Sequence, residues 1–384
     1  MNAATSRRTP LVLDTGVSIS SLILILLGVV MSYSATATLA LETPFPPLFV
    51  DHLTGLLAGL MLGAVGYWTP PVVIRRLALP AWAIGIVLLV ATLVVGVEVN
   101  GAQRWLVIPG VGFRFQPGEL VKCVTLVAVA DWLSRKQDRR ELTTVRTLQA
   151  AALAILPAGL LVLQPDLGNA LVLVALTALL LFIAGTPWPR FVVPGIAGVA
   201  LVGLYVLFNP YALRRVTGFL DPFRDSLGAG WQLVQSYLAF GEGGVGGTGL
   251  GNSRQKLDYL PEAHTDFVLA LVAEELGLIG VLVVIGCFAA LWISGTRVAR
   301  RARDKFDVLC AFAMVALLTI PAFLNASVVM GLVPTKGLTL PFLSYGRTSL
   351  VVCCFALGIL LGVARRHPAG PAPSIREARW PGVS

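Results

Sequence analysis

Ten long apolar runs are the feature that most constrains how this chain of 384 residues folds. A helix needs about 20 apolar residues to cross roughly 30 Å of hydrocarbon, and only helices and closed barrels satisfy their backbone hydrogen bonds in lipid. The runs are too long and too continuous for barrel strands. We therefore predict an all-α polytopic membrane protein with about ten transmembrane helices. The predicted spans lie near residues 17–38, 50–68, 77–97, 119–134, 147–163, 170–186, 190–208, 266–294, 307–331 and 345–364.

The composition agrees with a chain embedded in lipid. Hydrophobic residues make up 56% of it, charged residues only 13%, and the mean hydropathy is +0.82. A soluble domain of this size is roughly a quarter charged. The five cysteines all fall within apolar runs and lack metal-ligand spacing, so we interpret them as small buried hydrophobes. The first run is long enough to span and has no small-residue cleavage site, which argues against a cleavable signal peptide.

The distribution of Lys and Arg predicts the orientation in the membrane. With the N-terminus in the cytoplasm, basic clusters at residues 7–8, 75–76, 135–146, 297–305 and 365–366 all fall on the inner side. Both termini are then cytoplasmic, and the net charge of +9 reflects this bias rather than nucleic-acid binding. We predict one transmembrane domain over residues 1–365, with a large extracytoplasmic loop at 209–265, and a disordered Pro-rich tail over 366–384.

Polar residues gather in segments that this topology places outside. The segment at residues 101–122 is rich in glycine and proline, and we expect a structured loop that re-enters the membrane edge. Its Glu119 and Lys122 are three residues apart and share one helical face, so they can pair. The pair is either a structural ion pair or a lysine offered to an anionic headgroup. Trp105, in the same segment, also fits an interfacial belt residue.

Two further outer segments are short. LQPDLGN places Asp166 in a small loop between two spans, either as a turn and helix-cap residue or as a carboxylate facing a central cavity. The segment PTKGLTLPFLSYGRTS carries Lys336 and Arg347 into the last span.

The long loop at 209–265 contains an amphipathic piece, WQLVQSYLAF, and a glycine-rich run, GEGGVGGTGLGNS. No strand–turn–helix context surrounds the glycines, so they fit neither a Walker A nor a dinucleotide fingerprint, and we expect flexibility. Basic residues here break the positive-inside pattern, which indicates a phosphate-bearing partner. These residues are Arg214, Arg215, Arg224, Arg254 and Lys256.

The loop ends in KLDYLPEAHTDF, a charged stretch pressed against an apolar run. Asp266 stands at the mouth of the next span, with Glu274 and Glu275 about 12 Å deeper along the helix. A carboxylate at a span's entrance either caps the helix or serves a reaction there. Ionisable groups inside a span are functional candidates because they are costly to bury in lipid.

Taken in order over ten spans, these motifs resemble the SEDS family of cell-wall polymerases, also called the RodA/FtsW/SpoVE family. The matching stretches include NGAQRWL, FQPGELVK, LQPDLG, GLGNSRQKLDYLPEAHTDF, AEELG and PTKGLTLPFLSYG. The wording of PTKGLTLP, GLGNSRQK and LPEAHTDF is closer to the cell-division members than to the elongation members.

The resemblance implies a peptidoglycan glycosyltransferase of the inner membrane. Such an enzyme polymerises lipid II on the outer face during cell division and releases polyprenyl diphosphate. Asp266 matches the family's essential acidic residue, and Trp105, Glu119, Lys122 and Asp166 match other motif positions. The implied partners are a class B penicillin-binding protein (an FtsI-like transpeptidase) and other divisome proteins at the septum.

We hypothesise that Asp266 is the general base, because a sugar hydroxyl is a weak nucleophile and a positioned carboxylate assists its attack. His264 is an alternative proton acceptor. Cationic groups would hold the departing diphosphate, and Glu119 would orient Lys122. Mg²⁺ or Mn²⁺ is also compatible, since oxygen-ligand sites leave little sequence signature. The predicted substrate-binding residues are Trp105, Glu119, Lys122, Asp166, Arg214, Lys256 and Lys336.

The chain departs from the family pattern in places, and two alternatives stay open. YGRTS stands where the family commonly has YGGSS, and Pro321 and Ser327 replace polar Gln and Gly. One alternative is a lipid II flippase that uses intramembrane charges as a polar path. The other is a non-catalytic divisome scaffold, suggested by the unusual Arg347. The charges that would form the path are Glu119, Lys122, Glu274 and Glu275.

Overall fold

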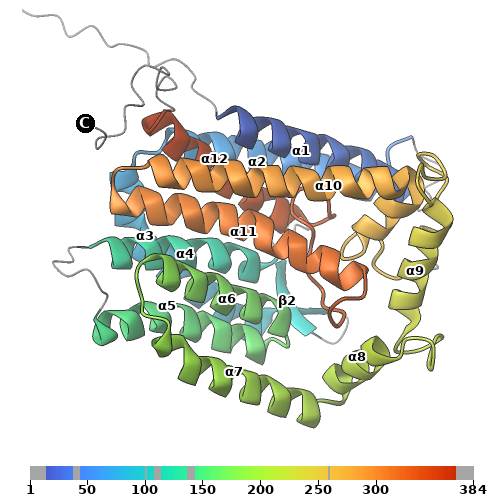
Figure 1. Ribbon diagram of the computed structural model, residues 1–384, viewed down its shortest axis with the longest axis horizontal. Helices are drawn as coiled ribbons and strands as arrows, with labels where there is room; N and C mark the ends of the chain where they lie inside the picture. The colour runs from blue at the N-terminus through green and yellow to red at the C-terminus, as the bar shows by residue number, and fades with distance from the viewer. Residues whose placement is uncertain are drawn as a thin grey trace, which may run out of the picture.

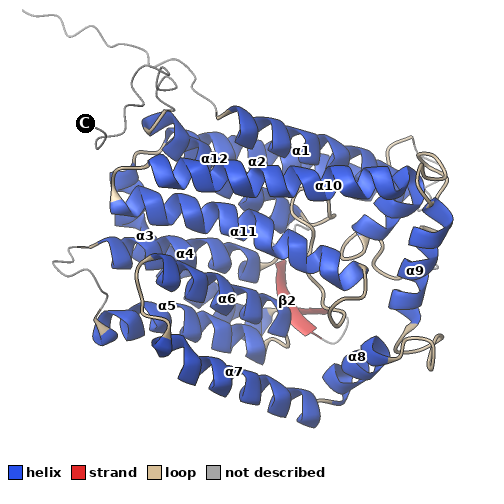
Figure 2. Ribbon diagram, in the orientation of Figure 1, coloured by secondary structure: helices blue, strands red, loops and turns tan. Residues whose placement is uncertain are grey.

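The computed structural model describes residues 14–37, 44–99, 102–107, 114–135, 143–257 and 260–368. Within these ranges the chain forms a bundle of long helices with one small sheet at one end (Figures 1 and 2). In chain order the elements are α1 (Thr15–Thr36), α2 (Pro47–Trp68), α3 (Pro71–Val95), β1 (Val97–Val99), β2 (Ala102–Val107), β3 (Arg114–Phe115), α4 (Pro117–Ser134), α5 (Thr144–Leu163), α6 (Leu167–Ile183), α7 (Pro189–Phe208), α8 (Pro210–Leu220), α9 (Trp231–Gly243), α10 (Val268–Arg301), α11 (Lys305–Val329) and α12 (Arg347–Arg366).

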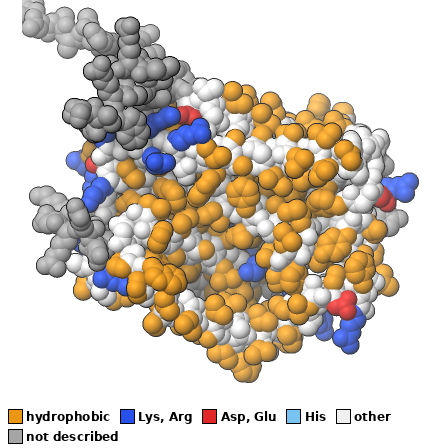
Figure 3. Space-filling model, in the orientation of Figure 1, with side chains coloured by type: hydrophobic (Ala, Val, Ile, Leu, Met, Phe, Trp, Pro, Cys, Tyr) orange, Lys and Arg blue, Asp and Glu red, His pale blue; other side chains and the backbone are white. Residues whose placement is uncertain are grey.

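Each of the ten predicted spans coincides with a helix, so the prediction of a polytopic helical membrane protein is confirmed. Eight of these helices are long and apolar enough to cross a membrane, and α6 is shorter, with 17 residues. Helix α4 has only 18 residues and carries three charged side chains. Figure 3 shows apolar side chains covering most of the visible face, with most of the visible charged ones near the two ends of the helices. The predicted tail lies outside the described residues from position 369 onward.

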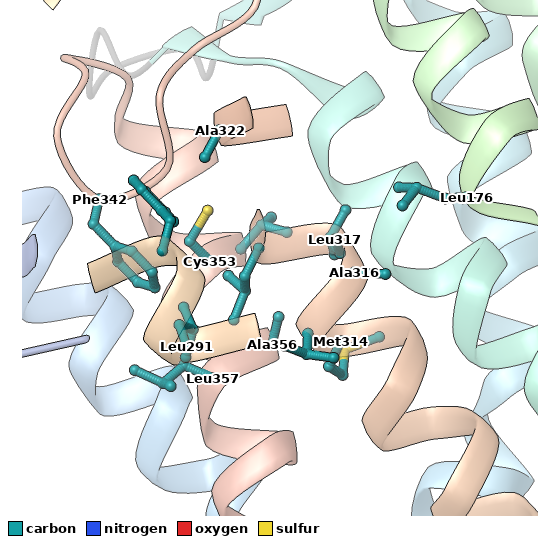
Figure 4. Close-up of a cluster of buried hydrophobic side chains, with 14 of the residues drawn as sticks. Leu176, Leu291, Met314, Ala316, Leu317, Ala322, Phe342, Cys353, Ala356 and Leu357 are labelled. Atoms are coloured by element: carbon teal, nitrogen blue, oxygen red, sulfur yellow. The ribbon is translucent and has the colours of Figure 1, made fainter. Parts of the chain in front are cut away.

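The centre of the bundle is formed by α4, α11 and α12, whose side chains are mostly buried. Apolar residues from several helices meet there, including Leu291 of α10, Met314 and Leu317 of α11, and Leu357 of α12 (Figure 4). Cysteines take part as predicted: Cys123, Cys310, Cys353 and Cys354 are buried and Cys287 is partly buried, all as free thiols. Helix α7, by contrast, buries none of its residues among those described.

Close backbone contact joins α2 to α12. Glycines recur every three or four residues along α2, at positions 55, 59, 63 and 66, and all face α12. A Cβ atom on Gly63 would lie 2.7 Å from the Cys354 carbonyl oxygen, and one on Gly358 would lie 2.0 Å from the Gly63 carbonyl oxygen. Small residues allow this approach, which supplies packing between helices where lipid removes the hydrophobic driving force.

The segment after α3 folds as three short antiparallel strands in the order β1-β2-β3. Val97 pairs with Trp105, and Leu106 pairs with Phe115. A structured loop is what the sequence predicts, but the strand pairing is an additional finding. Pro117 then begins α4, because a proline at the first helical position loses no hydrogen bond that the helix would have made.

Helix α10 is interrupted at Gly277, whose φ of 67° and ψ of −164° are not helical. The break frees backbone groups that the glycine-rich run satisfies. The backbone N–H of Thr248 donates to the Glu274 carbonyl (2.9 Å), and the N–H of Leu278 donates to the Gly244 carbonyl (2.9 Å). Broken helices are tolerated at membrane depth only when such groups find partners.

The glycine-rich run is therefore packed against α10, whereas we expected it to be flexible. A Cβ atom on Gly243 would lie 1.9 Å from the Ala273 carbonyl oxygen, and one on Gly247 would lie 2.2 Å from the Glu275 carbonyl oxygen. The glycines are needed for close approach to a helix backbone. The amphipathic piece of the same loop forms α9, in agreement with its pattern.

Candidate active site

Asp266 lies in the turn that leads into α10, and this turn is held from two sides. The Asp266 carbonyl accepts a hydrogen bond from the Asn325 side chain of α11 (2.7 Å). Ser344 donates its hydroxyl to the Thr265 carbonyl (2.5 Å), and the Tyr345 backbone N–H donates to the His264 carbonyl (2.8 Å). The α11–α12 connection thus fixes the backbone on which the Asp266 carboxyl group is carried.

The same connection lies directly against the carboxyl group. A Cβ atom on Gly337 would be 3.0 Å from Asp266 Oδ2. Asn325 also donates to the Leu338 carbonyl (2.6 Å), so one amide joins the two segments. Any side chain at position 337 would crowd the carboxyl group, which explains a glycine in the motif PTKGLTLP.

The surroundings of Asp266 move its pKa toward neutrality. Burial of its carboxyl group is the largest cause, the nearby Glu262 carboxylate adds to it, and the pKa rises from 3.8 to about 7. The Arg215 and Arg104 guanidinium groups oppose the rise, and Asp166 makes a small further contribution to it. A carboxyl group with a pKa near the working pH is suited to general base catalysis.

His264, the alternative base, is partly buried, and burial lowers its pKa while Glu262 opposes this. Its ring centroid lies 5.7 Å from that of Tyr345. His264 lies in the same turn as Asp266, two residues before it, so it is next to the candidate site.

A chain of buried polar side chains extends from α4 to α6. Lys122 Nζ donates to Glu119 Oε1 (2.8 Å) and to Asn169 Oδ1 (2.7 Å). Asn169 in turn donates its side-chain N–H to Asp166 Oδ2 (2.8 Å). The predicted pairing of Glu119 with Lys122 is confirmed, and a buried charge needs this full set of partners.

For Asp166 the sequence left open a helix cap or a carboxylate facing a central cavity, and the structure shows the cap. Its side chain caps α6 by accepting from the Asn169 backbone N–H (3.3 Å). It is also close enough to Asp266 to affect the pKa of that residue. Asn169, which connects it to Lys122, was missed by sequence reasoning because an asparagine in the first turn of a helix gives no separate signal.

Two arginines flank Asp266 from different elements. Arg104 of β2 donates to the carbonyls of Gln164 (3.3 Å) and Pro165, which precede α6. Arg215 of α8 donates to the Thr335 carbonyl (3.2 Å) in the α11–α12 connection. Arg104 was not among the predicted substrate-binding residues, and its only signal was a positive charge beside Trp105.

The remaining predicted cations lie in different settings. Arg214 is exposed on α8. Lys336 is partly buried beside Gly168, and burial lowers the pKa of its ammonium group. Trp105 is partly buried in β2, next in sequence to Arg104.

Lys256 is buried and acts as an anchor in this structure. Its Nζ donates to the Gly251 carbonyl (2.5 Å) and lies 3.4 Å from both Glu275 Oε1 and Ser34 Oγ. Ser34 of α1 donates to the same Glu275 oxygen (2.5 Å). These contacts fix the glycine-rich run to α1 and α10, and substrate binding by Lys256 stays a prediction.

The four intramembrane charges of the flippase alternative all have internal partners. Glu119 and Lys122 bind each other, and Glu275 is paired with Lys256. Glu274 accepts from the Arg254 backbone N–H (2.6 Å) and from the Ser253 hydroxyl. Each of these four side chains thus takes part in an ion pair or hydrogen bond inside the protein, and their use as a polar path stays a prediction.

Arg347, the unusual residue of the last motif, forms an ion pair with Asp51 of α2 (3.0 Å). The Tyr345 hydroxyl also lies 3.4 Å from Asp51. Thr348 accepts from the Gln116 backbone N–H (3.1 Å), just before α4. The two residues that distinguish YGRTS from YGGSS therefore connect the start of α12 to neighbouring segments.

The described residues contain no group of three or more His, Cys, Asp or Glu side chains placed to hold a metal ion. The carboxylates around Asp266 do not fit a site made by the protein alone. A divalent cation there would take most of its ligands from diphosphate and water, as Mg²⁺ commonly does.

Comparison with known proteins identifies the family. The model of the FtsW/RodA/SpoVE family, described as "Cell cycle protein", matches residues 15–368. A "Probable peptidoglycan glycosyltransferase FtsW" of Trichlorobacter lovleyi is 41% identical over 347 residues, covering 88% of this chain and 89% of that protein. The protein of the same name from Halomonas elongata is 38% identical and covers 95% of each chain.

Solved structures agree. A chain from "Structural coordination of polymerization and crosslinking by a peptidoglycan synthase complex" is 31% identical, with a TM-score of 0.75, over 92% of this chain and 98% of that one. The rod shape determining protein RodA of Thermus thermophilus is 29% identical, with a TM-score of 0.68, over 93% and 98%. The fold, the order of the motifs and these matches together show that the chain belongs to the FtsW/RodA/SpoVE family of cell cycle proteins.

Proposed function

We propose that this chain is a peptidoglycan glycosyltransferase that polymerises lipid II during cell division, with Asp266 as the general base. The observation that carries the proposal is the carboxyl group of Asp266. It is held at a loop–helix junction between arginines, with a pKa raised to about 7. Relatives 38–41% identical over most of the chain are named for this activity.

The reaction joins two lipid II molecules. A sugar hydroxyl of one molecule attacks the anomeric carbon of the other, and a new C–O bond forms. The bond between the anomeric carbon and the diphosphate oxygen breaks, and polyprenyl diphosphate leaves with the electron pair. Asp266 takes the proton of the attacking hydroxyl, so the nucleophile gains negative charge as the bond forms.

Arg104 and Arg215 are the cations best placed to act on the departing diphosphate. Both lower the pKa of Asp266, so both lie within electrostatic reach of the reacting atoms. Guanidinium groups bind phosphate oxygens through two parallel hydrogen bonds. We assign Lys336 a similar role, because a partly buried ammonium group whose pKa is lowered gains by meeting an anion.

The buried series of hydrogen-bonded side chains that links Glu119 to Asp166 supports the site. Lys122 holds Asn169, and Asn169 holds the Asp166 carboxylate beside Asp266. The chain thus sets the position of a negative charge near the base. Lys122 meets the diphosphate only if a substrate group reaches the small space of about 20 Å³ that it lines.

The membrane orientation follows from the same proposal. The acyl tails of lipid II stay in lipid, so the site belongs at a membrane surface. Asp266 lies two residues before α10, and α10 begins at the end of the bundle that carries α8 and α9 (Figure 1). We place this end of the bundle outside the cytoplasm and both termini inside it. We place the protein in the inner membrane at the division septum. The partner is then a class B penicillin-binding protein, an FtsI-like transpeptidase, together with other divisome proteins.

The experiment that tests the function measures two activities of the same preparation. Full-length protein with its class B partner is reconstituted in proteoliposomes containing fluorescent lipid II. Polymer is resolved on gels, and leaflet translocation is followed by quenching with a membrane-impermeant reductant. We expect glycan polymer. Translocation without any polymer would contradict the proposal and favour the flippase.

A further inference from the structure

A basic groove lies between α3 and α4, at the end of the bundle away from Asp266. It encloses about 560 Å³ and is lined by Arg75, Arg76, Asp131 and Arg135, with apolar residues of α3 beside them. Helix α3 runs from this groove to the sheet that carries Arg104, and 20 residues of helix span about 30 Å. The groove is therefore separate from the reaction at Asp266.

The floor of the groove is a single buried carboxylate. Asp131 is 2% exposed, and its two oxygens accept from Arg75 Nε (3.0 Å) and Arg135 Nη2 (2.6 Å). Arg76 lines the same groove and is exposed. Three guanidinium groups thus line a groove that holds one carboxylate, and two of them bind it, so the groove keeps an excess of positive charge.

Neighbouring groups hold these arginines in place. The Arg75 guanidinium lies 5.4 Å from the centroid of the Phe306 ring, and that of Arg135 lies 5.6 Å from the centroid of Trp132. Arg146 of α5 donates to the Arg135 carbonyl (2.7 Å). Such contacts reduce the conformational freedom that binding an anion would otherwise remove.

An apolar wall runs alongside the positive charge. Val72, Leu79 and Pro80 line the groove from α3, on the same helical face as the arginines. Arginines that only set the orientation of a membrane protein need no such hollow. A cationic rim beside an apolar wall instead matches an amphiphile, with its anionic group at the rim and a hydrocarbon chain along the helix.

We infer that this groove is a binding site for an anionic phospholipid such as phosphatidylglycerol. The headgroup phosphate lies between Arg76 and Arg135, and an acyl chain follows Val72 and Leu79. Basic pockets between helices at a membrane surface bind anionic headgroups in this way. The lipid joins α3 to α4, and because it binds only the folded protein it raises the stability of the bundle.

The test uses the full-length protein in detergent and native mass spectrometry with phosphatidylglycerol or phosphatidylcholine of identical acyl chains. Arg76→Gln combined with Arg135→Gln removes two charges from the groove. Arg297→Gln combined with Arg300→Gln removes two exposed charges from the C-terminal end of α10 and serves as the matched control. We expect about 30-fold weaker phosphatidylglycerol binding in the groove variant and wild-type binding in the control.

Thermal unfolding gives a second readout, and Arg76→Gln alone tests the site if the double variant does not fold. Phosphatidylglycerol should raise the melting temperature of wild type and control more than phosphatidylcholine does, with a smaller rise for Arg76→Gln. Equal binding of the two lipids, or equal loss in the control, would overturn the inference. Preferential binding of a polyprenyl diphosphate would also overturn it, because the groove would then be a site for the lipid carrier.

Discussion

The pH dependence of polymerisation gives the sharpest test of the local electrostatics. Asp266 accepts a proton only when it is ionised, and its pKa is raised to about 7. The rate should therefore rise with pH through neutrality. At pH 6 about a tenth of the carboxyl groups are ionised, so kcat/KM should be about tenfold below its plateau.

Two substitutions should move this rising limb in opposite directions. Glu262→Gln removes a negative charge that raises the pKa of Asp266, so the limb should shift to lower pH. Arg215→Gln removes a positive charge that lowers the pKa, so the limb should shift to higher pH. Glu242→Gln, which changes an exposed side chain near the C-terminal end of α9, is the control and should leave the limb in place.

The assay follows lipid II consumption from pH 5 to pH 9 at substrate concentrations well below KM. Arg215 is also assigned to the diphosphate, so its loss lowers the height of the profile, and the position of the limb is the quantity to compare. A limb that stays in place in both variants, or moves the same way in both, would refute the assignment of Asp266 as the titrating base.

Three further predictions concern stability. Because the folded-state pKa of Asp266 is raised from 3.8 to about 7, its stabilising contribution is full below pH 4 and is lost as the pH rises through 7. Asp266→Asn should therefore increase the free energy of unfolding, by at most about 4 kcal/mol at pH 8 and by less at pH 5, and the melting temperature should rise accordingly. An equal gain at both pH values would contradict this. Gly277→Ala should cost about 2–4 kcal/mol, because its Cβ would lie 2.4 Å from the Gly247 nitrogen at a positive φ, whereas Gly286→Ala in open space on the same helix should be neutral or stabilising. The ion pair of Arg347 with Asp51 has side chains 19% and 36% exposed, so a double-mutant cycle in thermal unfolding should give a coupling of about 1 kcal/mol or less, and several times that value would mean a larger role.

The sequence predicts the fold well because the length of each apolar run determines whether it forms a membrane-spanning helix. All ten spans and the amphipathic α9 follow from local periodicity, which lipid enforces strongly. The pairing of Glu119 with Lys122 is equally local, being set by their spacing on one helix. The position of Asp266 at the loop–helix junction is also read directly from the change in polarity.

Features that depend on distant segments were missed. Gly277 looks like an ordinary helical glycine, and the break becomes favourable only because the run near Gly244 supplies backbone partners. Lys256 resembles a phosphate ligand in sequence, but its burial brings it to Glu275, 19 residues away. Arg104 acts across about 60 residues on the chain before α6, which no local pattern records.

The most direct test of the central claim is the initial rate of lipid II polymerisation by Asp266→Asn with its class B partner. The matched control is Asp221→Asn, an exposed aspartate in the same loop. Removing a general base should lower the rate by about 10²–10⁴-fold, while the control stays within about twofold of wild type. Polymerisation by Asp266→Asn at the wild-type rate would contradict the account.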